Sequence, residues 1–106
     1  METINKVELA GHVGSVLRKT VGDTELARFS LCTNRVCMTG EYPVVETSWH
    51  DCHAFASDNI DLTRIEKGAW LHVIGRLKYT KYVDVNNNEK SVTEIVVTRI
   101  AECDRD

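Results

Sequence analysis

The chain of 106 residues is long enough for one domain whose core can hold it folded without a disulfide or a structural metal. Apolar residues make up 42% of the sequence and charged residues 27%, as in ordinary globular proteins, and no apolar stretch is long enough to cross a bilayer. The net charge of −3 does not exclude a nucleic-acid partner, because the run from 75 to 90 carries four basic residues against two acidic ones.

The N-terminal third of the chain predicts two strands. Apolar and polar residues alternate over 7–13, where Gly11 predicts a bulge or a sharp bend. A turn at Gly22 is followed by a second alternating stretch over 27–32.

A loop, a third strand and a short helix are expected next. Residues 35–44 hold a glycine and the only proline, which predicts a loop, and the third strand follows over about 45–55. The period then changes over 57–68, where apolar residues suit one face of a short helix that Ser57 or Asp58 would cap.

The C-terminal third predicts a long fourth strand over 70–82, an asparagine-rich hairpin tip over 86–88 and a fifth strand over 91–101. The order is therefore three strands, a short helix and two strands. This order predicts an all-β protein with the OB-fold: a five-stranded Greek-key barrel with one short helix between strands 3 and 4. We expect residues 1–106 to form this single domain.

Strand alternation divides the side chains of the third strand between two faces. Trp49, Asp51, His53 and Phe55 share one face, whereas the smaller Cys52 lies on the other. Such a face places two large aromatic rings beside polar groups.

The fourth strand shows a similar division. The spacing of a core face fits Leu71, Val73, Leu77 and Tyr79. The opposite face carries two cations and an aromatic ring, Arg76, Lys78 and Tyr82.

Aromatic rings between cations suit the binding of a single nucleic-acid strand, because a ring stacks on any base and Lys or Arg contacts the phosphates. In the alternative, Trp49 and Phe55 are core residues and their polar neighbours face water, as large aromatic side chains are usually buried. Alternation alone leaves both interpretations open.

Five segments resemble the bacterial single-stranded DNA-binding protein family, in order and at matching spacing over nearly the whole chain. They are NKVELAGHVG, ARFSLCTNR, ETSWHDCHAF, KGAWLHVIGRLKYTKY and TEIVV. The resemblance implies an OB-fold that assembles as a homotetramer, wraps DNA over aromatic and basic residues, needs no cofactor and is not an enzyme.

The same resemblance assigns roles to residues. Trp49 and Phe55 match the family's stacking aromatics, and Tyr82 stands where the family usually has a stacking tryptophan. His50, directly after the tryptophan, is expected at a subunit interface. The full set of candidate DNA-binding residues is Trp49, Phe55, Tyr82, Tyr79, Arg76, Lys78, Lys81, Arg35, Arg18 and Lys19.

Two departures from the family pattern weaken parts of the expectation. Val36 stands near a position where members often have a further tryptophan, and a valine cannot stack on a base. The sequence ends CDRD, without a flexible linker or an acidic, apolar tip, so we expect no tail domain and no tail-mediated protein partners.

Metal binding and catalysis receive little support from the sequence. His50, Cys52 and His53 are good zinc ligands, but Cys52 and His53 point to opposite faces and no C-x-x-C pair is present. A nucleophile elbow, a phosphate-binding glycine loop and a paired-carboxylate motif are all absent. We expect neither a metal nor a catalytic site.

The sequence therefore predicts sequence-independent binding and protection of single-stranded DNA in replication, recombination or repair. We expect a cytoplasmic, nucleoid-associated homo-oligomer without membrane contact, a tetramer or, as the alternative, a dimer. One rival is a tail-less accessory protein similar to the primosomal replication protein N family. The other is an OB-fold that contacts only proteins and whose DNA face has decayed.

Overall fold

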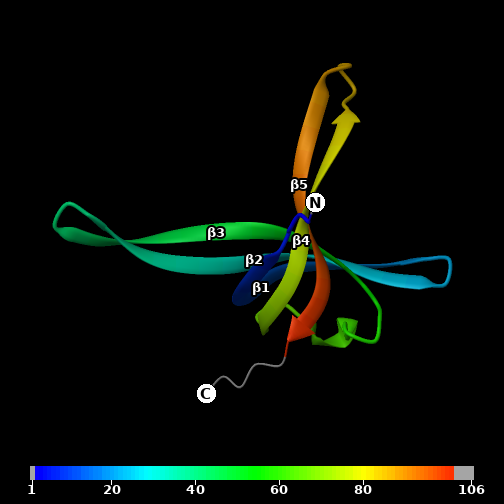
Figure 1. The fold of residues 1–106 in the computed structure, drawn as a ribbon, viewed down its shortest axis with the longest axis horizontal. Coiled ribbons are helices and arrows are strands. Elements are labelled where there is room, and N and C mark those ends of the chain that lie inside the picture. The colour runs from blue at the N-terminus through cyan, green and yellow to red at the C-terminus, as the bar shows by residue number, and fades with distance from the viewer. Residues whose placement is uncertain (1, 102–106) are drawn as a thin grey trace.

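The computed structural model describes residues 2–101 and arranges them as five strands and one short 3-10 helix (Figure 1). The elements are β1 (Val7–Val21), β2 (Thr24–Thr39), β3 (Tyr42–Phe55), η1 (Leu62–Arg64), β4 (Trp70–Val83) and β5 (Glu89–Ala101). The strands close into a barrel in the order β1-β2-β3-β5-β4, with β4 paired back to β1. The predicted five-stranded barrel is confirmed.

The core combines one set of alternating side chains from every strand with Ile60, Leu62 and Ile65 of the β3–β4 connection. On β2 the buried residues are Ala27, Phe29 and Leu31, and on β3 they are Cys52 and Ala54. Successive side chains on a strand point to opposite faces. The residues that alternate with these buried ones therefore face outward. The other strands contribute Val13, Leu71, Val73, Ile95, Val97 and Ile100.

Long hairpins project from this barrel as arms (Figure 1). The predicted loop over 35–44 is wrong, because β2 and β3 stay paired from Leu26↔Phe55 to Thr39↔Tyr42 and turn only at Gly40, whose φ is +64°. Pro43 is accommodated opposite Met38 because a two-stranded arm leaves one edge of each strand unpaired. At the end of the β4–β5 arm, the expected asparagine tip is confirmed.

The connection between β3 and β4 contains a single 3-10 turn and no α-helix. The backbone N–H of Arg64 donates to the carbonyl oxygen of Asp61, and that of Ile65 donates to the carbonyl oxygen of Leu62, each three residues earlier. The Asp61 side chain caps the turn by accepting from the Thr63 N–H at 3.0 Å. The short helix predicted over 57–68 is thus reduced to three residues, although Leu62 and Ile65 are buried as its pattern required.

Gly11 has a different role from the predicted bulge. A Cβ at Gly11 would lie 2.0 Å from the Cys32 carbonyl oxygen, so the glycine lets β1 and β2 approach closely. The irregularity in the β1–β2 register comes later, between Val13 and Val16. Within residues 2–101, no helix has the length and apolar content to span a membrane. Residues 102–106, which include the CDRD end on which the expectation of no tail rests, lie outside the described residues.

Candidate nucleic-acid interface

The outer face of β3 carries the two aromatic rings singled out by alternation. Trp49 is 60% exposed and Phe55 is 41% exposed, while Cys52 and Ala54 of the same strand are buried. The alternative in which both rings belong to the core is therefore wrong. Asp51 and His53 lie between them on the same face.

This face continues across β5 to β4. His53 is in register with Val96 of β5, and Val96 is in register with Arg76 of β4. Residues in register share a face of the sheet, so Arg76 lies on the same side of the barrel as Trp49 and Phe55. The same reasoning adds Lys78, opposite Glu94, and Tyr82, opposite Lys90. We call this outward surface of the barrel and its arms, which carries Trp49, Phe55, Arg76, Lys78 and Tyr82, the outer aromatic face.

The position of the Trp49 ring depends on a glycine of β1. A Cβ at Gly14 would lie 2.4 Å from Trp49 Cζ3 and 2.8 Å from Ser30 Oγ. The six-membered part of the indole therefore lies directly against the Gly14 backbone. Ser30 Oγ in turn accepts from the Ser15 N–H at 2.9 Å, which holds this end of the face together.

A small polar cluster lies between the two aromatic positions. Glu94 Oε2 is 3.5 Å from Arg28 Nη2 and 3.9 Å from His53 Nδ1, and the His53 ring centroid is 4.8 Å from that of Phe55. Partial burial lowers the pKa of His53, an effect that the nearby Glu94 opposes and Arg28 reinforces. The lowered pKa favours the neutral form of His53 beside Phe55.

Sequence reasoning missed Arg28 and Glu94. Alternation along each strand places both residues on the outer face. Only the pairing of the strands shows that Arg28 of β2 and Glu94 of β5 both lie beside His53 of β3. A carboxylate on this face would repel phosphates, and its pairing with Arg28 reduces that cost.

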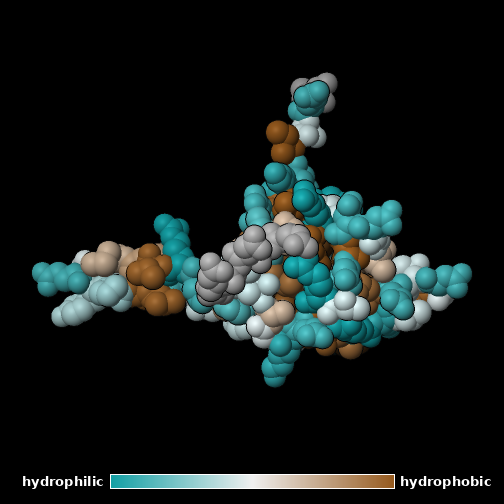
Figure 2. All heavy atoms as spheres, turned by 90° about the horizontal axis from the view of Figure 1, so that it is seen from below, coloured by the Kyte–Doolittle hydropathy of each residue, from teal (hydrophilic) through white to brown (hydrophobic). Residues whose placement is uncertain are grey.

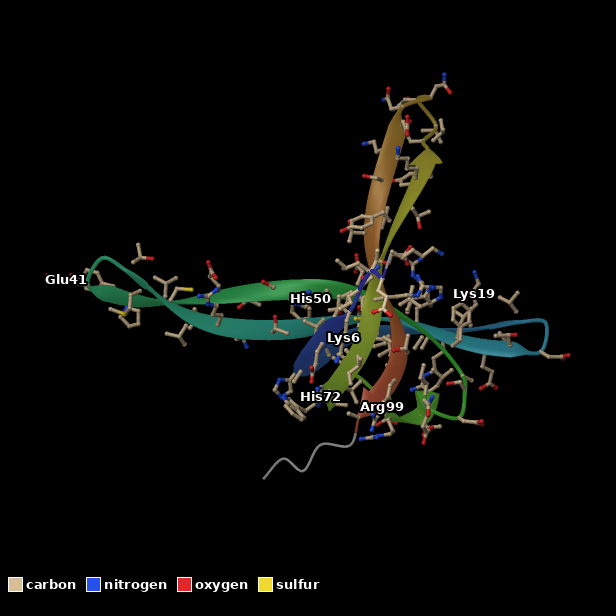
Figure 3. All side chains as sticks on the ribbon, viewed as in Figure 1. Lys6, Lys19, Glu41, His50, His72 and Arg99 are labelled. Atoms are coloured by element: carbon tan, nitrogen blue, oxygen red, sulfur yellow. The ribbon has the colours of Figure 1, made fainter. Side chains whose placement is uncertain are left out.

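The two cations predicted on β1 separate onto opposite faces. Lys19 is in register with Leu26, which is in register with Phe55, so Lys19 belongs to the outer aromatic face. Arg18 points the other way and donates from Nη2 to the Ile65 carbonyl oxygen at 2.5 Å. Arg18 therefore ties the β1–β2 hairpin to the β3–β4 connection, while Lys19 lies out on the hairpin (Figure 3).

The β4–β5 arm divides its predicted residues in the same way. Tyr79 and Lys81 alternate with Lys78 and Tyr82, so they lie on the opposite face of the arm. Tyr79 was predicted on the core face, yet it is 69% exposed, because the arm has left the barrel and no core lies beneath it. Lys81 Nζ lies 3.6 Å from Glu89 Oε1.

The β2–β3 arm carries a group of exposed apolar side chains, and the brown spheres of the left-hand projection in Figure 2 lie between its hydrophilic tip and the barrel. Its exposed apolar residues are Val36, Met38, Tyr42, Val44 and Val45. Arg35, the predicted phosphate contact on this arm, is in register with Glu46.

His50 lies at the root of the β2–β3 arm, far from the tip marked by Glu41 (Figure 3). It is half-buried, and its Nε2 is 2.9 Å from Thr33 Oγ1. Its place at a subunit interface stays a prediction. Among residues 2–101, no three His, Cys, Asp or Glu side chains are grouped so that they could hold a metal ion.

Comparison with known proteins identifies the family. Residues 4–102 match the single-strand binding protein family. The chain belongs to this family. A relative, the mitochondrial single-stranded DNA-binding protein 1-B of Xenopus laevis, is 34% identical over 110 residues, which cover 92% of this chain and 74% of the relative. The mitochondrial single-stranded DNA-binding protein of Danio rerio is 33% identical, over 93% of this chain and 75% of its own.

A solved structure shares the fold. The Plasmodium falciparum SSB complex with ssDNA superposes with a TM-score of 0.81 at 28% identity, covering 93% of this chain and 90% of that one. The predicted family is confirmed, but the bacterial origin that we expected is not supported, since the relatives named above are mitochondrial proteins of vertebrates.

Proposed function

We propose that the protein binds single-stranded DNA along the outer aromatic face, without catalysing a reaction. The observation that carries the proposal is the exposure of Trp49 and Phe55 on the same face as Arg76 and Lys78, in a chain of the single-strand binding protein family. The names of the relatives and of the Plasmodium falciparum complex support it.

Stacking and charge supply the affinity. Each base stacked on an aromatic ring contributes about 1–3 kcal/mol, and Trp49, Phe55 and Tyr82 provide three such rings. Arg76, Lys78 and Lys19 would contact phosphates from the same face, releasing counterions and making the affinity fall with salt. Ring stacking accepts every base, so a strand of any sequence would bind.

The candidate residues on the opposite face have other tasks in this proposal. Lys81 faces away from Tyr82, and Arg18 is engaged with the Ile65 carbonyl oxygen. Arg35 lies on the β2–β3 arm and Tyr79 on the far side of the β4–β5 arm, so these four residues would contact DNA only where the strand wraps around the arms.

The experiment that tests the proposal is a titration with oligo-dT at low and moderate salt. A variant carrying Trp49→Ala and Tyr82→Ala should lose at least tenfold in affinity, because two stacking platforms are removed. Tyr79→Ala, a tyrosine on the opposite face of the same arm, is the matched control and should lose much less. Unchanged affinity of the double variant would show that the site is elsewhere.

The assembly and cellular role form part of the proposal. We infer a homotetramer, with a dimer as the alternative, that protects exposed strands during replication, recombination or repair. The cytoplasmic location predicted from the sequence is tested by imaging a tagged protein, since the relatives named above are mitochondrial. Sedimentation distinguishes the two oligomers, with His50→Ala as the variant at the expected interface.

A further inference from the structure

Side chains of four strands form one row across the outer aromatic face. Arg76 of β4 is in register with Val96 of β5, and Val96 is in register with His53 of β3. His53 is in turn in register with Arg28 of β2. Residues in register share a face of the sheet, so an arginine lies on each side of β3. A DNA strand that follows the exposed rings of β3 would therefore pass Arg28 on one side and Arg76 on the other.

Arg28 is paired with a carboxylate, that of Glu94. Glu94 Oε2 lies 3.5 Å from Arg28 Nη2 and 3.9 Å from His53 Nδ1. On the β4 side, Glu94 is in register with Lys78. The carboxylate thus lies among cationic and imidazole groups of the outer aromatic face, a position to which a phosphate oxygen would also be attracted.

The ion pair is suited to exchange with a phosphate. Its separation of 3.5 Å is longer than the roughly 2.7–2.9 Å of a charge-assisted hydrogen bond, and the Arg28 side chain is 54% exposed. Water screens such a pair, so it contributes little to stability. A phosphate can instead accept two parallel N–H groups from the guanidinium, which is a stronger contact.

We propose that Arg28 is a further phosphate contact and that Glu94 holds it in the free protein. When DNA binds, a phosphate oxygen replaces the Glu94 carboxylate at the Arg28 guanidinium. The carboxylate stays opposite Lys78, so a cation remains near it after the exchange. The inference rests on the proposed function and deepens it, since it adds a contact on the β2 side of the outer aromatic face.

The exchange predicts a particular salt dependence. A lysine that binds a phosphate releases a counterion, whereas Arg28 would exchange an anion of the protein for one of the DNA and release few counterions. In Glu94→Gln the guanidinium loses its carboxylate partner. Arg28 should then release a counterion as Lys78 does, and the slope of log affinity against log salt concentration should steepen by about 0.7.

The test is a double-mutant cycle of Glu94→Gln and Arg28→Ala, titrated with oligo-dT at several salt concentrations. Glu94→Gln should raise the affinity at least about fivefold, the scale of one surface ion pair. Adding Arg28→Ala should remove this gain and restore the wild-type slope. If Arg28 only neutralised Glu94, the alanine would change nothing once the carboxylate is gone, and that result would overturn the proposal.

Glu89→Gln is the matched control, because it also removes a carboxylate of β5 that lies near a lysine. Glu89 Oε1 is 3.6 Å from Lys81 Nζ, on the opposite face of the arm. This variant should keep the wild-type slope. An equal gain in both glutamine variants would show an effect of net charge alone, which contradicts the exchange.

Two further outcomes separate the exchange from the proposed function. Thermal unfolding checks that each variant folds, and neither Arg28 nor Glu94 belongs to the buried core. Wild-type binding of oligo-dT with the same affinity and slope in Glu94→Gln would overturn the exchange while leaving the proposed function intact. Failure of the wild-type protein to bind oligo-dT would instead overturn the proposed function.

Discussion

The Gly14→Ala variant tests the link between a β1 backbone position and DNA affinity. The added Cβ would lie 2.4 Å from Trp49 Cζ3 and 2.9 Å from Trp49 Cη2, far inside the contact distance of two carbon atoms. Gly14 is not among the glycines with positive φ, so alanine fits the backbone without strain. The indole ring, which is 60% exposed, must swing away.

The expected cost falls on binding and not on folding. An exposed ring can move with a stability change of roughly 1 kcal/mol or less, and the smaller entropy of the unfolded alanine chain offsets part of it. Displacement of the ring removes a stacking platform worth about 1–3 kcal/mol per base, which corresponds to about 5- to 150-fold in affinity.

The assay is a double-mutant cycle with oligo-dT. Gly14→Ala, Trp49→Ala and the double variant are compared with the wild-type protein, with thermal unfolding as the check on folding. If Gly14 acts through Trp49, the alanine at position 14 should cost nothing further once the ring is gone. Wild-type affinity in Gly14→Ala, or an equal loss in the Trp49→Ala background, would refute the reasoning.

Three further predictions concern charge, pH and the β2–β3 arm. Because the folded protein lowers the pKa of His53, its neutral form contributes stability above the ordinary pKa of about 6.5, and this stability is lost as the pH falls below 6.5. The melting temperature should therefore drop between pH 7 and pH 5. The drop should be smaller in His53→Gln. In a plot of log affinity for oligo-dT against log salt concentration, Lys78→Ala should make the slope shallower by about 0.7. Lys81→Ala, on the opposite face of the arm, is the control. If both variants gave the same slope, the phosphates would not lie on the face of Lys78. By strand alternation Val36 of β2 lies on the same side as the outer aromatic face, and it is 69% exposed. Val36→Trp should therefore strengthen oligo-dT binding at least severalfold by adding a stacking ring. An unchanged affinity would mean that DNA does not follow this arm.

Alternation predicted which side chains face outward wherever a core lies beneath the strand. Trp49 and Phe55 were separated from Cys52 by parity alone, and the barrel bears this out. Tyr79 is in phase with the buried Val73 in the alternation along β4, but it lies beyond the barrel, where no core covers its face of the arm. The point at which a strand leaves the barrel depends on the whole fold, so it cannot be predicted from the local alternation of residues.

The remaining errors and omissions also come from long-range pairing. Residues 35–44 have the glycine and proline of a loop, yet the pairing of β2 with β3 extends through them. The contact of Glu94 with Arg28 and His53 joins three strands, and only the register of all three brings these groups together. The family resemblance supplied the candidate stacking residues, but it did not point to the carboxylate of Glu94.

The most direct test of the account is intrinsic fluorescence of the Trp70→Phe variant during titration with oligo-dT. The sequence contains two tryptophans, so Trp49 would be the sole reporter in this variant. The account predicts strong quenching at low salt that weakens as salt rises, because bases stack on an exposed Trp49 and phosphates are held by cations. Binding without any change in Trp49 fluorescence would contradict the central claim that DNA lies on the outer aromatic face.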